Sequence, residues 1–290
     1  MRVAFFGTAA FGADVLRRLA ERGALEIVAV VSQPDRPSGR GRRMASPPVA
    51  DAARVLGIPL AQPQNASVDP PQADAGVVVA FGQLIRPPLL GAYPLLNLHP
   101  SALPRWRGAA PIERAIMAGD DRTAVCVIGI VAELDAGPVY ARADIPIAET
   151  DDAGAVGARA LELGVPLLER ALLDPVEPVA QGEEGVTYAR KITAEDRILD
   201  WGRAAVELDR VVRALSPHVG ARTVIDGTPV VVWRARPLPG RSRPGEIRPP
   251  LTVGCAEGEL ELLDVQPAGK RRMPAADYVR GLRAPPRIAA

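Results

Sequence analysis

Cysteine, histidine and aromatic residues are scarce in this chain of 290 residues, and their scarcity excludes several classes of protein. The two cysteines, Cys126 and Cys255, lie far apart inside apolar runs, so they form neither a disulfide framework nor the closely spaced ligands of a metal site. No apolar run is long enough to span a bilayer, and the apolar start of the chain is too short for the core of a signal peptide. We therefore expect a soluble cytoplasmic protein that uses no metal and has no membrane partner.

A dinucleotide-binding signature is also missing, although the chain opens with a short apolar run that ends at Gly7. The segment from Gly7 to Gly12 reads Gly-Thr-Ala-Ala-Phe-Gly and lacks the second glycine that lets a pyrophosphate approach the backbone. Ser32 and Gln33 follow the next apolar run, where an acidic residue would bind a ribose. These two absences argue against a nicotinamide-dependent enzyme.

Apolar residues, by contrast, are abundant, at 48% of the chain, which at this length indicates two domains with sizeable cores. The net charge of +1 conceals an asymmetry, because 14 Lys or Arg stand against 9 Asp or Glu from Ala205 onward and 21 against 25 before it. A basic C-terminal third is compatible with a polyanionic partner, although an ordinary solvated surface has the same balance.

Strands and helices are predicted to alternate as far as about residue 175. Short β-branched or aromatic runs predict strands over 2–7, 25–32, 76–81, 95–99 and 123–131. Helical spacing of apolar residues predicts helices over 11–22, 49–55, 109–118 and 153–173. The alternation indicates an α/β fold with a doubly wound parallel sheet.

The pattern changes after Trp201. Short strands are predicted over 224–232, 251–255 and 260–265, separated by clusters of Pro, Gly and Arg. This pattern is typical of a small all-β barrel or sandwich. We therefore expect a first domain over 1–189, a linker over 190–206 and a β-barrel domain over 207–290.

The segment with the most chemistry is the strand predicted over 95–99. Side chains two apart on a strand share a face, so Asn97 and His99 are expected to point together, with Pro100 ending the strand directly after them. The pair then lies at the carboxyl end of a strand, where open α/β sheets build their sites. An asparagine can donate to a developing oxyanion and a histidine can move a proton near neutral pH. The alternative is that His99 is a structural histidine, buried in the core with its ring nitrogens hydrogen-bonded.

Two further segments carry polar groups. Asp135 follows an apolar strand within Leu-Asp-Ala-Gly-Pro, where its carboxylate could orient His99 or relay a proton, or instead make a local turn hydrogen bond. The segment 32–43 holds four arginines, two glycines and two prolines with no apolar period. It is expected to be an exposed, flexible basic loop suited to phosphate contacts, although a merely solvated loop has the same composition.

Together these segments resemble the methionyl-tRNA formyltransferase family, whose members move a formyl group from 10-formyltetrahydrofolate to the α-amine of methionyl initiator tRNA. The resemblance runs along nearly the whole chain and is carried by FFGT, SQPDRPSGRGRR, VVVAFGQLI, LNLHPSALPRWRGAAPIERAI, LDAGP, ITAEDRILDW and LLDVQPAGKRRM. It implies a monomeric bacterial enzyme of translation initiation and one-carbon metabolism. Its fold is then a formyltransferase-type, Rossmann-like catalytic domain followed by an OB-like barrel that binds tRNA.

The resemblance also implies roles for single residues. The catalytic triad falls on Asn97, His99 and Asp135. The folate-binding residues fall on two strand-end turns: Phe81, Gly82 and Leu84 in one, and Ser101, Ala102, Leu103 and Pro104 in the other. The tRNA-binding residues are the loop arginines Arg36, Arg40, Arg42 and Arg43, with Arg40 as the central contact.

The sequence departs from the family at a few positions. Pro100 replaces a glycine that is common after the histidine, Ala136 replaces a common threonine, and the stretch 62–75 is short. Two alternatives stay open. A sugar-nucleotide N-formyltransferase would share the triad but gives no reason for the Arg40 loop, whereas a noncatalytic RNA-binding module leaves the triad unexplained.

Overall fold

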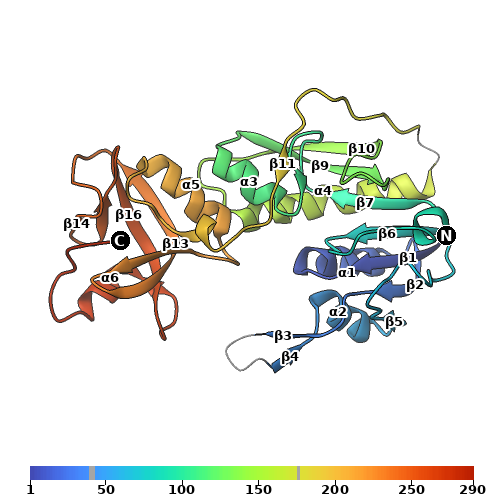
Figure 1. Ribbon diagram of the computed structural model, residues 1–290, viewed down its shortest axis with the longest axis horizontal. Helices are drawn as coiled ribbons and strands as arrows, with labels where there is room; N and C mark the ends of the chain where they lie inside the picture. The colour runs from blue at the N-terminus through green and yellow to red at the C-terminus, as the bar shows by residue number, and fades with distance from the viewer. Residues whose placement is uncertain (39–42, 175–176) are drawn as a thin grey trace. The chain divides into compact units, whose positions relative to one another are not determined.

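A computed structural model describes residues 1–38, 43–174 and 177–290, and the chain divides into two compact units (Figure 1). The first unit consists of Met1–Ala109, Thr123–Ile145 and Gly157–Ala189. The second unit consists of Ala110–Arg122, Pro146–Val156 and Arg190–Ala290. The second unit therefore includes two segments from the first half of the chain besides the expected C-terminal part.

The first unit is built on a seven-stranded sheet. Its strands are β1 (Arg2–Gly7), β2 (Glu26–Val31), β5 (Leu60–Ala61), β6 (Ala75–Val79), β7 (Leu95–His99), β9 (Arg122–Gly129) and β10 (Val139–Pro146), in the order β10-β9-β7-β6-β1-β2-β5. The neighbouring strands β5, β2, β1, β6 and β7 run parallel to one another, and β9 runs antiparallel to β7. The chain moves outward from β1 to β5 and then returns to the other side of β1 with β6. The predicted α/β fold is confirmed, with β9 and β10 added beside β7 on one side of the sheet.

Helices pack on this sheet through small and apolar residues. They are α1 (Ala10–Arg22), α2 (Pro48–Leu56) and α4 (Ala153–Leu173). In α1 the buried residues Val15, Leu16 and Leu19 recur at helical spacing, and Gly23 ends the helix in a left-handed conformation. Gly164 lets α4 approach the sheet, since an added Cβ would lie 2.9 Å from Leu98. Among the described residues, no helix combines the length and apolarity that crossing a bilayer requires.

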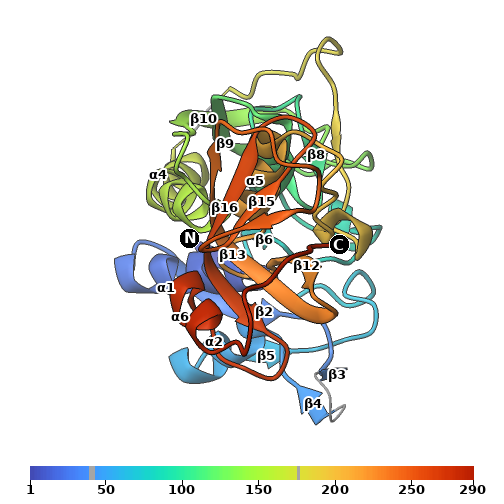
Figure 2. The same cartoon turned by 90° about the vertical axis from the view of Figure 1, so that its left-hand side faces the viewer.

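The second unit contains an antiparallel sheet and several short helices (Figure 2). Its strands are β12 (Ala221–Ile225), β13 (Thr228–Leu238), β14 (Ile247–Arg248), β15 (Thr252–Gly254), β16 (Glu259–Pro267) and β17 (Met273–Pro274). Its helical elements are α3 (Pro111–Ala118), η2 (Glu195–Arg197), α5 (Ala205–Leu215) and α6 (Ala275–Arg280). The sheet order is β12-β13-β16-β15-β14, with β17 beside β16. The predicted C-terminal β domain is therefore confirmed.

Residues 287–290 close this sheet into a barrel. On one side Val224 exchanges backbone hydrogen bonds with Ala290, next to the β12 edge. On the other side the Ile247 amide of β14 donates to the Arg287 carbonyl. One short segment thus bonds to both edge strands, which covers part of each sheet edge.

Two sequence expectations for this unit differ from the structure. The stretch 224–232, expected as one strand, spans the β12–β13 hairpin, because Asp226 and Gly227 both take positive φ and turn the chain. The stretch 190–206, expected as a linker, contributes Leu199, Trp201 and Ala205 to the barrel core. The packed part of the C-terminal unit therefore begins before residue 207.

Asp226 holds the closing segment, and its replacement by alanine is expected to destabilise the barrel. Its two carboxylate oxygens accept hydrogen bonds of 3.1 Å from the Arg287 and Ile288 amides, and its φ of 42° disfavours alanine. Loss of these contacts should lower the free energy of unfolding by about 1–3 kcal/mol. Urea titration followed by Trp201 and Trp233 fluorescence measures the effect. Asp226→Asn, which tolerates a left-handed backbone, should lose less, and equal midpoints for all three proteins would contradict the assignment.

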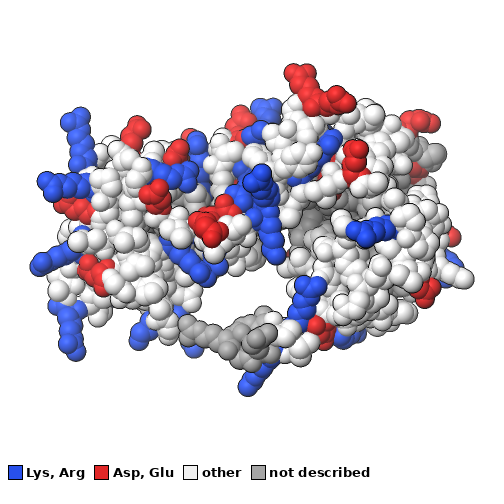
Figure 3. All heavy atoms as spheres, viewed as in Figure 1, with Lys and Arg blue, Asp and Glu red and all other residues white. Residues whose placement is uncertain are grey.

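Lys and Arg side chains project from the face of the second unit seen in Figure 3, with Asp and Glu side chains beside some of them. Arg236 pairs with Glu261 and Arg272 pairs with Asp264, both across neighbouring strands or turns of the barrel. Exposed pairs of this kind contribute little to stability. Each pair is neutral overall, so it leaves the net basic excess of this third of the chain unchanged.

Candidate active site

Strand β7 positions Asn97 and His99 on one face of the sheet, as the strand alternation predicts. Leu98 between them faces α4, while both polar side chains approach Asp135. His99 is 5% exposed, which makes it one of the few polar residues buried in the first unit. The side chains lie at the carboxyl end of β7, and β6 runs parallel beside it with Val78 paired to Asn97. The loops after β6 and β7 therefore leave the sheet at the same edge.

Asp135 lies in the loop after β9, and its carboxylate connects the other polar groups. The Asn97 amide donates to Oδ1 over 3.2 Å, and the Gly108 backbone amide donates to Oδ2 over 2.8 Å. Oδ2 also lies 3.7 Å from His99 Nδ1. The structure therefore brings Asn97, His99 and Asp135 together, although they are up to 38 residues apart in the sequence.

His99 has an oxygen acceptor near each ring nitrogen. Nε2 lies 3.0 Å from the Trp106 carbonyl oxygen, and Nδ1 faces the Asp135 carboxylate. A neutral imidazole carries one N–H, whereas the charged ring carries two and can donate toward both oxygens. The neutral ring can therefore donate to only one of these two oxygens at a time.

A short strand, β8 (Arg107–Gly108), supplies the backbone groups of this site. It pairs in parallel with β11 (Tyr188–Ala189), and the Trp106 amide donates to the Thr187 hydroxyl over 2.9 Å. Trp106 and Gly108 both have positive φ, so the backbone turns sharply where it contacts His99 and Asp135. Backbone contacts from residues 106–108 were not foreseen from the sequence, because carbonyl and amide groups leave no residue-type signal.

The Asp135 loop lies tightly against the end of β9. Asp135 itself has a φ of 48°, a conformation that costs a non-glycine residue free energy unless its surroundings hold it. A Cβ on Gly137 would lie 1.7 Å from the Gly129 carbonyl oxygen, so only glycine fits there. The Leu-Asp-Ala-Gly-Pro motif thus encodes a compact turn that presents one carboxylate.

The turn after β7 contains the four residues expected to contact folate. Leu103 is buried against Cys126 and Ile128, and Ala102 packs partly on the same cluster, whereas Pro104 is half-buried. Ser101 is fully buried, and its hydroxyl has no hydrogen-bond partner among the described residues. Burial raises the pKa of the Cys126 thiol to about 11, which favours the protonated thiol near neutral pH.

The loop after β6 contains the other expected folate contacts. Phe81 is buried against Phe6, and its carbonyl accepts hydrogen bonds from the Thr8 hydroxyl and the Gln33 amide. Gly82 takes a φ of 73°, and the Leu84 side chain after it is 69% exposed. The loop leaves the sheet between β1 and β6, where the strand order reverses, and ligands of α/β sheets bind at such a point.

The basic loop is only partly described. Arg36–Ser38 (β3) and Arg43–Ala45 (β4) form a short antiparallel pair where the sequence indicated no regular structure. Arg36 and Arg43 are exposed, whereas Arg40 and Arg42 lie outside the described residues.

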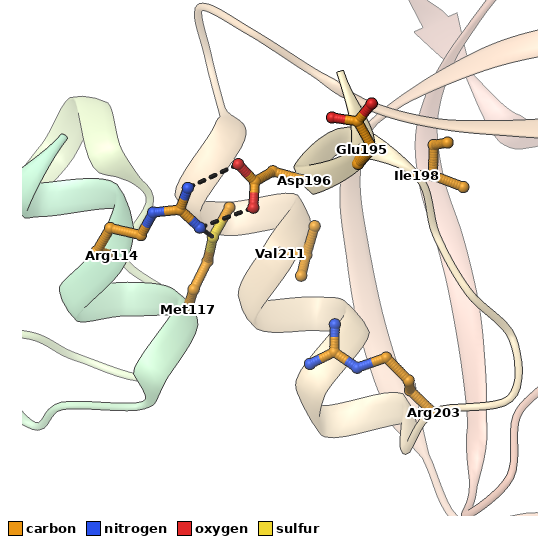
Figure 4. Close-up of a pocket in the computed structure, with 7 residues that line it drawn as sticks. All are labelled: Arg114, Met117, Glu195, Asp196, Ile198, Arg203 and Val211. Atoms are coloured by element: carbon orange, nitrogen blue, oxygen red, sulfur yellow. Dashed lines mark hydrogen bonds and ion pairs between the residues drawn. The ribbon is translucent and has the colours of Figure 1, made fainter. Parts of the chain in front are cut away.

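A hollow in the second unit surrounds an ion pair between Arg114 and Asp196 (Figure 4). It is lined by Arg114, Met117, Glu195, Asp196, Ile198, Arg203 and Val211. Arg114 donates to both carboxylate oxygens of Asp196, over 2.8 and 2.6 Å, and this pairing lowers the pKa of Asp196 to about 2. Thr193 donates to the same carboxylate through its amide and hydroxyl. The protein itself satisfies this carboxylate, which joins α3 to η2.

Metal ligands do not cluster in the part of the chain that the structure describes, where no group of three His, Cys, Asp or Glu side chains is placed to hold an ion. The polar side chains that converge at the site are an amide, an imidazole and a carboxylate.

Comparison with known protein families identifies the family of this chain. The formyl transferase model matches residues 1–172, and the model of the formyl transferase C-terminal domain matches residues 191–283. The methionyl-tRNA formyltransferase of Paracoccus denitrificans is 43% identical over 99% of this chain and 100% of its own length. The chain belongs to the methionyl-tRNA formyltransferase family. A second family member, from Cereibacter sphaeroides, is 40% identical over 98% of this chain and 97% of its own length.

A solved structure supports the same fold. HypX from Aquifex aeolicus, in a complex with tetrahydrofolic acid, matches with a TM-score of 0.66 and 20% identity, over 96% of this chain and 47% of its own. At that identity the likeness shows the fold alone. The family resemblance predicted from the sequence motifs is confirmed by the relatives and the two matching domain models.

Proposed function

We propose that this protein transfers the formyl group of 10-formyltetrahydrofolate to the α-amine of methionyl initiator tRNA. The observation that carries the proposal is the convergence of Asn97, His99 and Asp135 at the carboxyl end of β7, in a chain of the methionyl-tRNA formyltransferase family. An amide donor, an imidazole and a carboxylate are the groups that acyl transfer to an amine uses.

Asn97 is assigned to the formyl oxygen. Attack of a neutral amine on the formyl carbon places negative charge on that oxygen, and a fixed donor stabilises the charge. The Asn97 amide has two N–H groups, and only one is needed for its 3.2 Å bond to Asp135. The second is left for the oxygen, where removal of such a donor costs about 3–4 kcal/mol.

His99 and Asp135 are assigned to charge and proton movement. A charged His99 ring supports the negative oxygen and can supply a proton to the departing nitrogen. The Asp135 carboxylate takes the proton from the attacking amine, directly or through a water, because it retains acceptor capacity beyond its bonds to Asn97 and Gly108. Both roles need only short movements, since the two side chains already lie side by side.

The donor is assigned to the region beside the two strand-end turns. The turn at 101–104 and the loop at 81–84 leave the same edge of the sheet, near the point where the strand order reverses. The buried Ser101 hydroxyl without a partner fits a site whose polar groups are completed by a ligand. Exposed Leu84 offers an apolar surface to a flat ring.

The acceptor is assigned to tRNA because of the arginines at 36–43 and the basic C-terminal barrel. Arg36 and Arg43 project from a two-stranded hairpin, a suitable support for phosphate contacts. Arg40 and Arg42 are proposed to act with them.

An acceptor assay tests the function. The protein is incubated with 10-formyltetrahydrofolate that carries a labelled formyl group, and separate reactions receive methionyl initiator tRNA, methionyl elongator tRNA, an amino-sugar nucleotide or buffer alone. We expect label in the initiator tRNA at a rate at least about 10-fold above the elongator tRNA and the sugar, because a recognition difference of 1.4 kcal/mol gives that factor. Label mainly in the sugar would identify a sugar-nucleotide N-formyltransferase. Binding of tRNA with no transfer to any acceptor would leave a noncatalytic RNA-binding protein.

A further inference from the structure

Gln181 contacts the backbone of the Asp135 loop with its side-chain amide nitrogen. Its Nε2 donates to the Asp135 carbonyl over 2.8 Å and to the Gly137 carbonyl over 2.7 Å. Both N–H groups of the side chain are therefore spent on the turn that presents the carboxylate. The contact spans more than forty residues of sequence, which a local turn hydrogen bond does not do.

The carbonyl oxygen of Gln181 is also used. It accepts bonds from Arg107 Nε over 3.1 Å and Arg107 Nη2 over 2.8 Å. Arg107 is 9% exposed, so its guanidinium is held in place. The positively charged Arg107 guanidinium beside Oε1 polarises the amide and strengthens the bonds that Nε2 donates.

These contacts close a ring around Asp135. Arg107 belongs to β8, and the next residue on that strand, Gly108, donates its backbone amide to Asp135 Oδ2. The loop backbone is thus tied to β8 through Gln181, and the carboxylate is tied to the same strand through Gly108. Asp135 needs such support because its φ of 48° is unfavourable for a non-glycine residue.

We propose that Gln181 is a positioning residue, which acts through Asp135 and fixes the carboxylate relative to His99 and the reacting amine. The inference rests on the proposed formyl transfer. Without Gln181 the Asp135 and Gly137 carbonyls lose their side-chain donor, and the loop can relax toward a less strained backbone. A displacement of about 1 Å at a reacting group can lower a rate by about 100-fold.

Gln181→Ala is expected to lower kcat for formyl transfer by about 10- to 100-fold. The KM values for the formyl donor and for tRNA should change by less than about threefold, since Gln181 makes its contacts to the loop and to Arg107. In an Asp135→Ala background the same replacement should have no further effect on the residual rate, because a residue that acts through Asp135 has nothing left to position.

Gln181→Glu separates positioning from packing. A carboxylate keeps the bonds from Arg107 but cannot donate to the two loop carbonyls, so kcat should fall as far as in Gln181→Ala although the fold keeps its Arg107 contact. Relative to the unmodified protein, this variant should recover activity as the pH falls, because a protonated carboxyl group regains one O–H donor. If Gln181→Ala unfolds, Gln181→Glu carries the test.

The experiment measures kcat, both KM values and the thermal midpoint for each variant, beside the unmodified protein and Asp74→Ala. Asp74 bonds the Arg2 amide at the amino end of β1, and its loss should leave kcat unchanged. An inactive unmodified protein would refute the proposed function rather than the role of Gln181. An active unmodified protein with a Gln181→Glu variant within threefold of it, or with losses that add to those of Asp135→Ala, would overturn the inference.

Discussion

Asp135→Asn is expected to lower kcat for formyl transfer by at least about 100-fold, the effect of removing a general base. The carboxylate accepts bonds from Asn97 and from Gly108, and it lies 3.7 Å from His99 Nδ1. An asparagine has the same shape but one accepting oxygen, and its NH2 group would face one of these donors. The amide also cannot take the proton of the attacking amine. Single-turnover rates with saturating methionyl initiator tRNA measure the loss directly.

The isosteric change should leave the fold intact, because the Asp135 backbone keeps its bond to Gln181. A thermal midpoint within a few degrees of the unmodified protein is therefore expected. Asp74→Asn is the matched control, since Asp74 also accepts a backbone amide, that of Arg2, over 2.7 Å, but lies at the other end of the parallel strands. Full transfer activity in Asp135→Asn would remove Asp135 from the mechanism.

The central pair of the site could be predicted because strand geometry is local. The alternation of Leu95–His99 puts Asn97 and His99 on one face, and Pro100 limits the strand to the residues that the sequence indicates. On its own, the Asp-x-Gly pattern of Asp135 and Gly137 also fits an ordinary turn. The resemblance to the family singled it out, and the structure places its carboxylate beside both residues.

The remaining contacts of the site depend on distant segments. Thr187 and Gln181 reach residues 106–108 and 135–137 only after the chain has returned through α4 and beyond. The donors and acceptors involved are mostly backbone groups, which every residue carries. No periodicity or spacing in the sequence connects these segments, so their contribution could be found only from the fold.

Two features of the second unit differ in how far the sequence reveals them. The β12–β13 turn has a local sequence signal, whereas the closure of the sheet has none. Asp226-Gly227 between two apolar runs is a strong hairpin signal, and its turn chemistry divides the stretch 224–232 that apolar content alone presents as one strand. Barrel closure is different, because residues 287–290 bond to β12 and β14 from the far end of the chain. Edge satisfaction of this kind has no sequence pattern.

Asn97→Ala is expected to lower kcat by about 100- to 1,000-fold, the range found when one oxyanion donor is removed. The replacement removes the N–H assigned to the formyl oxygen and frees Asp135 Oδ1 of its 3.2 Å bond. The KM for the formyl donor should change little, because the donor's proposed contacts lie in the turns at 81–84 and 101–104. Steady-state kinetics with both substrates varied separates the two parameters.

Asn97→Asp distinguishes the oxyanion role from simple support of Asp135. The variant keeps the shape of the side chain but places a second carboxylate beside Asp135 Oδ1, so one of the two is driven to bind a proton. If Asn97 only supports Asp135, a proton shared between the two carboxyl groups can replace its N–H. The variant should then stay active near the pH at which one of the two carboxyl groups is protonated. If Asn97 stabilises the formyl oxygen, the variant should be at least as slow as Asn97→Ala at every pH above that point, since an ionised carboxylate repels the developing charge. A variant faster than Asn97→Ala at neutral pH would therefore reassign Asn97 to positioning and leave His99 alone to support the oxygen.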